Sequence, residues 1–478
     1  MNRAILLLTA TITSFLLSAQ IKVEKWDLRK CVEYALQNNV TIKQADLQKK
    51  FAELELQQSK WAAWPSANFS TNLGYGSGRN QDPTSFSLIT TDYIFNNFSL
   101  QASFDFFNWF TKKNTIVVKD LNLQATNEGV EKAKNDIALN VAVSYLQILL
   151  ASEQINVAKV QVEQTKLQLE STRKQVQAGK LPELNAANLE SQLANDSSNL
   201  ISAEAAKNQA ILLLKVLLNL DPSVPFDVET PPVDAIPVES LGELQPEAVY
   251  ALAVKNQPQQ KVDELNLKAA ITNVKVARGA MYPTISMFGS LGSVFNNRSK
   301  KIVSTTAINP PIGTVTVNGN TYTVYPPSPY EQPVFGNFPY FDQLNQNFRQ
   351  SIGIGVSVPI LNGGVLRSNW LRLKLTVKQV ELQKEKNSTA LKQDIYKAYY
   401  DATAAIQKFN ANKKAVETAE RAYEFAKKRY DVGLLSTYDL ITTQNNMLQA
   451  KINMMYSQFD FVFKMKLLEF YKGEGLKL

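Results

Sequence analysis

The residue types that most often carry chemistry are scarce in this chain. Its 478 residues include no histidine, which excludes Ser-His-Asp triads, histidine proton shuttles and histidine metal ligands. The single cysteine, Cys31, leaves no thiol pair for a disulfide or a zinc site, and no glycine-rich phosphate loop is present. The 51 basic and 43 acidic residues are well mixed, and no carboxylate pair stands out from the solvated helix faces. We therefore expect no catalytic residue, metal, cofactor or nucleic acid partner, and we rank a secreted enzyme that uses carboxylates alone last.

Residues 1–19 have the order of a secretory signal peptide. Arg3 precedes the apolar run 4–17, and the small residues of Leu17-Ser18-Ala19 form a cleavage site. Two basic residues stand directly before Cys31, which does not fit a lipid-attachment site, so we expect a cleaved and unlipidated chain with Cys31 as a small apolar helix residue. Outside the signal peptide, no segment reaches the about 18 apolar residues that a membrane helix needs.

The remainder of the chain is an internal duplication. A shift of 254 residues aligns 100–219 with 354–473 without a gap, and a shift of 218 aligns the earlier part of each half. The matched pairs include Tyr145 with Tyr399, Gly179 with Gly433, Leu181 with Leu435, and Pro65 with Pro283. The two halves are therefore expected to share one architecture.

Each half begins with a helix, followed by two strands. The helices are expected at about 27–62 and 245–280, and each ends at an aromatic-Pro pair. Polar and apolar residues then alternate with the period of two that is typical of strands. These strands begin near Ala67, Leu100, Thr284 and Ile352.

Two long helices complete each half. The first is expected at about 112–177 and again at 366–431, on the order of 100 Å long at 1.5 Å per residue. Apolar residues spaced by three and four, with one phase slip at Lys413, indicate coiled-coil packing. The shorter returning helices are expected to end near Asn219 and Tyr471.

These elements predict a mostly α fold with a small β part. The expected organisation is a signal peptide (1–19), a first repeat (20–220), a proline-rich linker (221–245) and a second repeat (246–478). The second repeat includes a long exposed segment at 296–345, which we expect to be an irregular loop because it is rich in Tyr, Asn and Pro.

Four strands cannot close a membrane barrel alone, because single-chain barrels begin at about eight strands. Open strand edges in lipid leave backbone groups without hydrogen bonds, at a cost of several kcal/mol each. If the strands span a membrane, the chain must oligomerise. Two copies would supply eight strands and three would supply twelve, and the strand count does not choose between them.

The chain resembles the TolC-type outer membrane efflux proteins over nearly all of its length. The most specific piece is the turn from Arg429-Tyr430-Asp431-Val432-Gly433 to Tyr438-Asp439-Leu440, followed by Gln444. The first-half counterpart runs from Arg173 to Leu184, and the strand end Val358-Pro359-Ile360-Leu361-Asn362 is a second family-like piece.

The resemblance implies a homotrimer in the outer membrane of a Gram-negative bacterium. Its twelve strands would form a barrel in outer-membrane lipid, and its long helices would form a hollow α-barrel across the periplasm. Such a protein is a passive exit duct of a tripartite efflux or type I secretion system. It would contact a periplasmic adaptor (a membrane fusion protein) and an inner-membrane pump of the proton-driven or ABC type, while the cargo stays undefined.

The resemblance also places candidate sites at the two helix turns. The adaptor-contacting tips would comprise Gly179, Lys180, Leu181, Pro182, Gly433, Leu434, Ser436 and Thr437. The local alternative for the two glycines is a helix C-terminus that needs a left-handed residue.

The channel entrance would be formed by Asp439, Leu435, Thr442 and Glu183. Three copies of Asp439 would make a ring of negative charge, although a carboxylate at a helix N-terminus is also stabilised locally. Thr442 stands at a second acidic position of the family and Leu435 at a gate arginine position, so an apolar constriction at Leu435 is an equal alternative. A solvated carboxylate is the favoured interpretation of Glu183.

A rival function is a periplasmic coiled-coil adaptor or structural protein. It would account for the signal peptide and the heptads. It does not account for four alternating strands at equivalent places in both halves.

Overall fold

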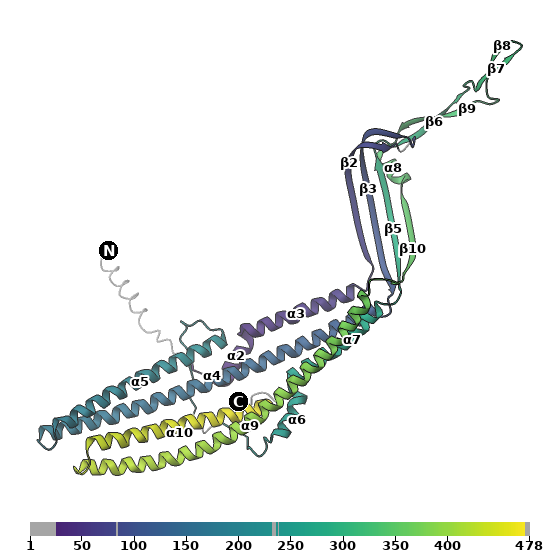
Figure 1. Cartoon of the computed structure of the whole chain (residues 1–478). Coiled ribbons are helices and arrows are strands. Elements are labelled where there is room, and N and C mark those ends of the chain that lie inside the picture. Colours follow the sequence, from purple (N-terminus) through teal and green to yellow (C-terminus); the bar gives the residue numbers. More distant parts are fainter. Residues whose placement is uncertain (1–24, 83–84, 232–235, 238, 474–478) are drawn as a thin grey trace, which may run out of the picture. The chain divides into compact units, whose positions relative to one another are not determined.

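The computed structural model describes residues 25–82, 85–231, 236–237 and 239–473, so the predicted signal peptide lies outside the described residues. The chain divides into two compact units. The first holds residues up to Leu54, 120–270 and 376–478, and the second holds 55–119 and 271–375. Figure 1 shows long helices in the first unit and extended strands in the second.

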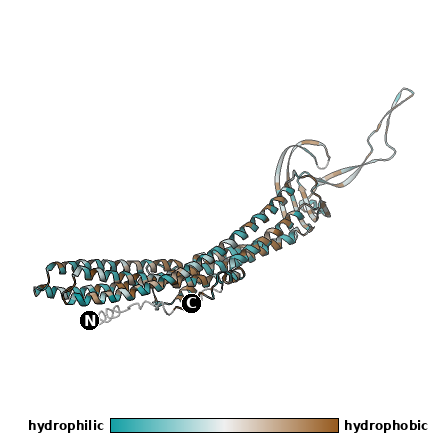
Figure 2. Cartoon of the chain, turned by 60° about the horizontal axis from the view of Figure 1, so that its bottom comes forward, coloured by the Kyte–Doolittle hydropathy of each residue, from teal (hydrophilic) through white to brown (hydrophobic). Residues whose placement is uncertain are grey.

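The long helices confirm the predicted hairpin in each half. In the first half α4 spans Thr111–Gln177 and α5 spans Glu183–Leu218, and in the second α9 spans Val365–Asp431 and α10 spans Thr437–Tyr471. Brown, apolar residues recur along these helices between teal, polar ones in Figure 2, as a packed amphipathic helix requires. None of the described helices carries an apolar stretch that could cross a membrane.

The first helix of each half was predicted as continuous, and that prediction is wrong. The structure has α2 (Leu28–Asn38) and α3 (Val40–Trp61), and in the second half α6 (Pro246–Asn256) and α7 (Pro258–Gly279). Asn39 and Gln257, at equivalent positions, adopt extended backbone at the break. The Asn39 amide donates to Leu217 O at 2.7 Å, and that of Gln257 donates to Phe470 O and Tyr471 O at 3.2 Å. Each break therefore ties the first helix to the end of the returning helix.

Two buried clusters hold the first unit together. The larger joins α2, α4, α5 and α10 around Val141, Tyr145, Leu214 and Phe459, and the other joins α6, α9 and α10 around Val249, Ile395 and Leu468. The predicted linker contributes a short strand, β4 (Asp227–Val228), which pairs in parallel with β1 (Lys25–Trp26).

The second unit contains a four-stranded antiparallel sheet in the order β10-β5-β3-β2. Its strands are β2 (Ser66–Gln81), β3 (Leu88–Phe107), β5 (Thr284–Asn296) and β10 (Arg349–Ser357). All four strands were predicted, but β3 begins at Leu88, well before the predicted start near Leu100, because it pairs with β2 as far as Gln81. Because β2 and β10 each have one neighbour in the sheet, both are edge strands.

The strand register gives the sheet two chemically different faces. One face is mainly apolar and carries Phe69, Leu73, Leu100, Phe104, Met287, Leu291, Ile352 and Ile354. The opposite face carries mainly Ser, Asn, Gln and Gly, including Asn68, Ser70, Gln101, Ser290, Ser351 and Gly353. This pattern is typical of a sheet with one face toward lipid and the other toward water.

Segment 296–345 is exposed, as predicted, but it is not irregular. It forms a ladder of β6 (Lys300–Ile308) with β9 (Tyr330–Asn337), a hairpin of β7 (Gly313–Val317) with β8 (Asn320–Val324), and the short helix α8 (Tyr340–Gln346). The proline content of the segment suggested a loop, but most of its prolines lie between the ladders, at 310–311 and 326–329, where they do not interrupt strand pairing.

Candidate functional site

Both helix tips are built by the same backbone motif. Gly179 and Gly433 have φ angles of 70° and 77°, in the left-handed region that favours glycine. Each donates its N–H three residues back, and the next residue donates five residues back: Lys180 N to Gln175 O at 2.9 Å, and Leu434 N to Arg429 O at 2.8 Å. These bonds are the Schellman closure of a helix C-terminus. The local role considered for the two glycines is therefore confirmed.

The first tip is otherwise open to solvent. Lys180 and Glu183 are exposed and Leu181 is half-buried. Pro182 occupies the N-cap of α5 with extended backbone, and its missing N–H costs little at the start of a helix. The exposed side chains of this tip are thus available to a partner.

The second tip is closed by a reciprocal cap. Ser436 is the N-cap of α10, and its Oγ accepts from Asp439 N at 3.1 Å and donates to the Asp439 carboxylate at 2.7 Å. This pair stabilises the first turn of the helix. Asp439 therefore stabilises its own helix through these two contacts. Its side chain is exposed.

The other predicted entrance residues differ in accessibility. Thr442 is exposed, and its hydroxyl donates to Tyr438 O at 2.9 Å. Leu435 is half-buried against Ala426, Tyr430 and Leu440. Among the hydrogen bonds and ion pairs of the described residues, none joins Glu183 to Asp439.

Thr437 departs from its predicted place on a contact surface. The residue is only 1% exposed, and its hydroxyl donates to Tyr430 Oη at 3.3 Å. Its side chain therefore holds the second tip together instead of facing a partner in this conformation.

Tyr430 is a site residue that the predictions missed. It is 3% exposed, and its hydroxyl lies 3.0 Å from Thr172 Oγ1 on α4. It thereby joins the α9/α10 hairpin to the α4/α5 hairpin. In the sequence, Tyr430 follows Val416, Ala419, Tyr423 and Ala426 at the three- and four-residue spacing of a coiled coil, and a buried tyrosine hydroxyl needs a polar partner. That requirement was the available signal, but the sequence does not identify the partner.

A polar seam continues between the hairpins. Asp196 on α5 is 2% exposed and accepts from Thr165 Oγ1 at 2.7 Å and from Gln192 Nε2 at 2.8 Å. Across the seam, Gln444 on α10 donates to Thr165 Oγ1 at 3.2 Å, while its own Oε1 has no partner. A groove of about 590 Å³ beside the seam is lined mostly by Asn, Gln and small residues of α4, α5 and α10. Because a net hydrogen bond contributes only about 0.5–1.5 kcal/mol, this seam is less cohesive than an apolar core.

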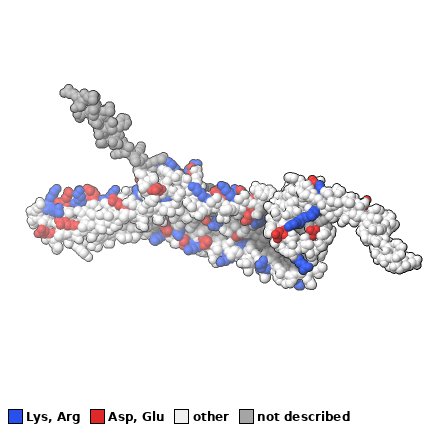
Figure 3. All heavy atoms as spheres, turned by 90° about the horizontal axis from the view of Figure 1, so that it is seen from above, with Lys and Arg blue, Asp and Glu red and all other residues white. Residues whose placement is uncertain are grey.

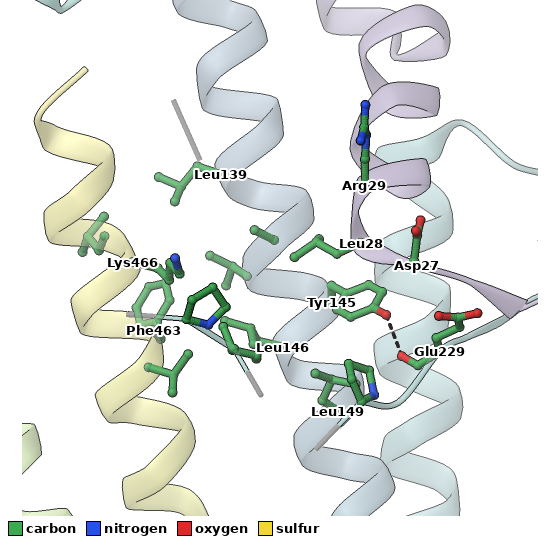
Figure 4. Close-up of a pocket in the computed structure, with 17 residues that line it drawn as sticks. Asp27, Leu28, Arg29, Leu139, Tyr145, Leu146, Leu149, Glu229, Phe463 and Lys466 are labelled. Carbon is green, nitrogen blue, oxygen red and sulfur yellow. Dashed lines mark hydrogen bonds between the residues drawn. The ribbon is translucent and has the colours of Figure 1, made fainter. Parts of the chain in front are cut away.

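A separate, mostly apolar pocket of about 360 Å³ lies in the first unit, between α4, α10, the start of α2 and the linker (Figure 4). Its polar groups are paired: Tyr145 Oη donates to Glu229 O at 2.6 Å, and Lys466 Nζ donates to Glu469 at 2.8 Å. Burial raises the pKa of the Tyr145 hydroxyl above its usual range. These paired groups converge on no reacting atom.

Cys31 is fully buried, in agreement with its prediction as an apolar helix residue, and burial raises its pKa to about 12. The described residues include no group of three or more acidic, cysteine or histidine side chains placed to hold a metal ion.

Comparison with known proteins identifies the architecture. The family model for outer membrane efflux proteins matches residues 31–220 and 249–457, which are the two halves of the duplication. Toxin and drug export protein A of Aggregatibacter actinomycetemcomitans is 21% identical over 364 residues, which cover 76% of this chain and 69% of that protein.

Solved structures share the fold. The CmeC outer membrane channel of Campylobacter jejuni superposes with a TM-score of 0.74 at 17% identity, over 94% of this chain and 87% of that chain. The outer membrane protein VceC of Vibrio cholerae superposes with a TM-score of 0.73 at 16% identity, over 94% of this chain and 97% of that chain. The duplicated helix hairpins, the two-faced sheet and a family match across both halves lead to one conclusion: the chain belongs to the outer membrane efflux protein family.

Proposed function

We propose that three copies of this chain form a passive exit duct that opens at the cell surface. As a family member the chain is an outer-membrane efflux channel protein of a Gram-negative bacterium, extending into the periplasm. The observation that supports an oligomeric barrel is the sheet, which has an apolar face, a polar face and two open edges, and the choice of three copies follows from the family resemblance. Pairing β10 of one copy with β2 of the next satisfies both edges. Three four-stranded sheets then close a twelve-stranded barrel with the apolar faces toward lipid and the polar faces toward the passage.

The helix tips are proposed as the adaptor-binding surface. Lys180, Leu181 and Pro182 are offered by the first tip, and Leu434 and Ser436 by the second. Leu434 is 70% exposed at a turn whose backbone hydrogen bonds are satisfied. An apolar side chain presented at a rigid turn is suited to burial against a partner helix. Gly179 and Gly433 set the shape of the two turns, and the buried Thr437 supports the second.

The entrance is proposed to lie beside the second tip, at Asp439 and Thr442. Both are exposed on the first turns of α10, and three copies of Asp439 would attract cations. Leu435 is half-buried in its own tip, so it would line an apolar constriction of the channel only after the tips move. Glu183 would add negative charge to the entrance from the first tip. The energy for transport would come from an inner-membrane pump, proton-driven or ABC type, so the duct itself is proposed to be neither an enzyme nor cofactor-dependent.

The test of the trimer is native mass spectrometry of the mature protein extracted from outer-membrane fractions in detergent. The proposal expects a trimer from that fraction. A monomer or dimer recovered in water from the periplasm would refute it and favour the coiled-coil adaptor. In planar bilayers, the entrance proposal expects Asp439→Asn to reduce cation selectivity, with Asp431→Asn, an exposed carboxylate at the end of α9, as the matched control.

A further inference from the structure

The strands between β5 and β10 form a projection of unusual composition. One residue in five of the whole chain is charged, yet no charged residue occurs between Lys301 and Glu331. In Figure 3 this projection is almost entirely white, whereas the helices carry blue and red along their length. A solvent-exposed segment of this length without charge needs a physical explanation.

The outer hairpin of the projection has two distinct faces. In the β7–β8 register, Val315 pairs with Tyr322 on one face, which also carries Val317 and Val324. The other face carries Thr314, Thr316, Thr321 and Thr323, with the hydroxyls of Thr316 and Thr321 3.3 Å apart. The turn is Asn318-Gly319 with both φ angles positive, the conformation that suits a two-residue hairpin. The apolar face is left uncovered, and Tyr322 is 55% exposed.

The base of the projection is fixed to the sheet. Arg298 Nε donates to Asp92 O at 2.8 Å, and Lys301 Nζ lies 3.0 Å from the Asp342 carboxylate of α8. The fully buried Gln343 accepts from Asn296 N at 3.0 Å and donates to Phe338 O at 2.8 Å. The projection is therefore an ordered extension of β5 and β10 and not a slack connection.

Beyond this base, among the strands that the structure describes, β6 pairs only with β9 and β7 pairs only with β8, which gives two separate two-stranded ladders. Among the described elements, no helix or other strand packs extensively against β6–β9 or β7–β8. A two-stranded ladder is marginally stable alone in water. Its edges are also open, and β7 and β8 carry neither the charges nor the prolines that usually protect an edge. The projection thus lacks a covering surface.

We infer that the apolar face of β7–β8 packs against the same hairpin in the neighbouring copies of the trimer, an inference that rests on the proposed function. The projection leaves from β5 and returns to β10, the edge strand that would pair with the next copy, so it begins at the seam between copies. In a cyclic trimer identical surfaces meet where they point toward the three-fold axis, and a neutral surface there avoids the repulsion that like charges would create. The threonine face remains toward water. Three hairpins joined in this way form an uncharged collar at the outer mouth of the duct.

The test uses paired cysteine variants in intact outer membranes, since the native Cys31 is fully buried. Val315→Cys places a thiol on the apolar face, and Thr316→Cys places one on the opposite face of the same strand. A short bifunctional maleimide should link copies of Val315→Cys with a yield several-fold higher than for Thr316→Cys. A monofunctional maleimide measures how accessible each thiol is.

Equal linking of the two variants would overturn the inference, as would no linking of Val315→Cys in protein that is still a trimer by native mass spectrometry. Binding of the projection to surface polysaccharide, without links between copies, would also overturn it. If the protein is not a trimer, the proposed function fails together with the inference. The two failures are therefore distinguishable.

Discussion

The contact between Tyr430 and Thr172 makes a quantitative prediction about the opening of the helix tips. Tyr430→Phe keeps the ring but removes the hydroxyl that lies 3.0 Å from Thr172 Oγ1 and accepts from Thr437 Oγ1 at 3.3 Å. Thr172 and Thr437 are 0% and 1% exposed, so their hydroxyls lose a partner where water does not replace it. An unsatisfied buried polar group costs about 1–3 kcal/mol. The cost arises only while the two hairpins are packed together.

Parting the hairpins would hydrate both threonines and remove this cost. The equilibrium between packed and parted tips should therefore shift toward the parted state by about 5- to 150-fold. Single-channel recording in planar bilayers measures this shift as the fraction of time that the duct conducts. Tyr438→Phe is the matched control, since Tyr438 lies at the same tip and is 73% exposed.

A double-mutant cycle isolates the pair. Thr172→Val should also raise the open fraction, and adding it to Tyr430→Phe should change little further, because the interaction is already lost. Additive effects would show that the two hydroxyls act separately. An open fraction of Tyr430→Phe equal to those of the wild type and Tyr438→Phe would refute the conclusion that this contact holds the hairpins together.

Three further predictions concern single sites. Gly433→Ala should destabilise the second tip by about 1–2 kcal/mol, because the φ of Gly433 is positive although the space around it is open. Its control, Gly129→Ala in the interior of α4, should instead stabilise the protein by about 0.5–1 kcal/mol. The temperature at which the trimer dissociates should therefore fall for the first variant and rise for the second. Ser436→Ala removes the cap shared with Asp439 and should cost about 1 kcal/mol by the same measurement, whereas Ser436→Asp should largely restore it. Cys31 should resist maleimide at pH 8 in the native protein and react once the protein is denatured. Since its folded pKa is raised from 9.0 to about 12, the stability that this thiol contributes is complete below pH 9 and is lost as pH rises toward 12, which alkaline unfolding of wild type and Cys31→Ala would reveal.

Much of this architecture is local in origin, and the sequence predicted it accordingly. The bounds of α4, α5, α9 and α10 follow from heptad spacing and from glycines that can end a helix in the left-handed conformation. The four strands follow from alternation with a period of two. Because the chain is duplicated, each helix and strand predicted in one half could be checked against its counterpart in the other half.

The features that the sequence did not predict depend on residues distant along the chain. The breaks at Asn39 and Gln257 are stabilised by carbonyls at 217 and at 470–471. The regular structure of segment 296–345 depends on pairing between β6 and β9, although the residues between them have the composition of a loop. The partner of the Tyr430 hydroxyl is a threonine 258 positions earlier. A sequence therefore determines periodicity, caps and the need of a buried hydroxyl for a partner, whereas only the tertiary structure decides which distant group supplies it, because hydrogen-bond geometry depends on distance in space and not on separation along the chain.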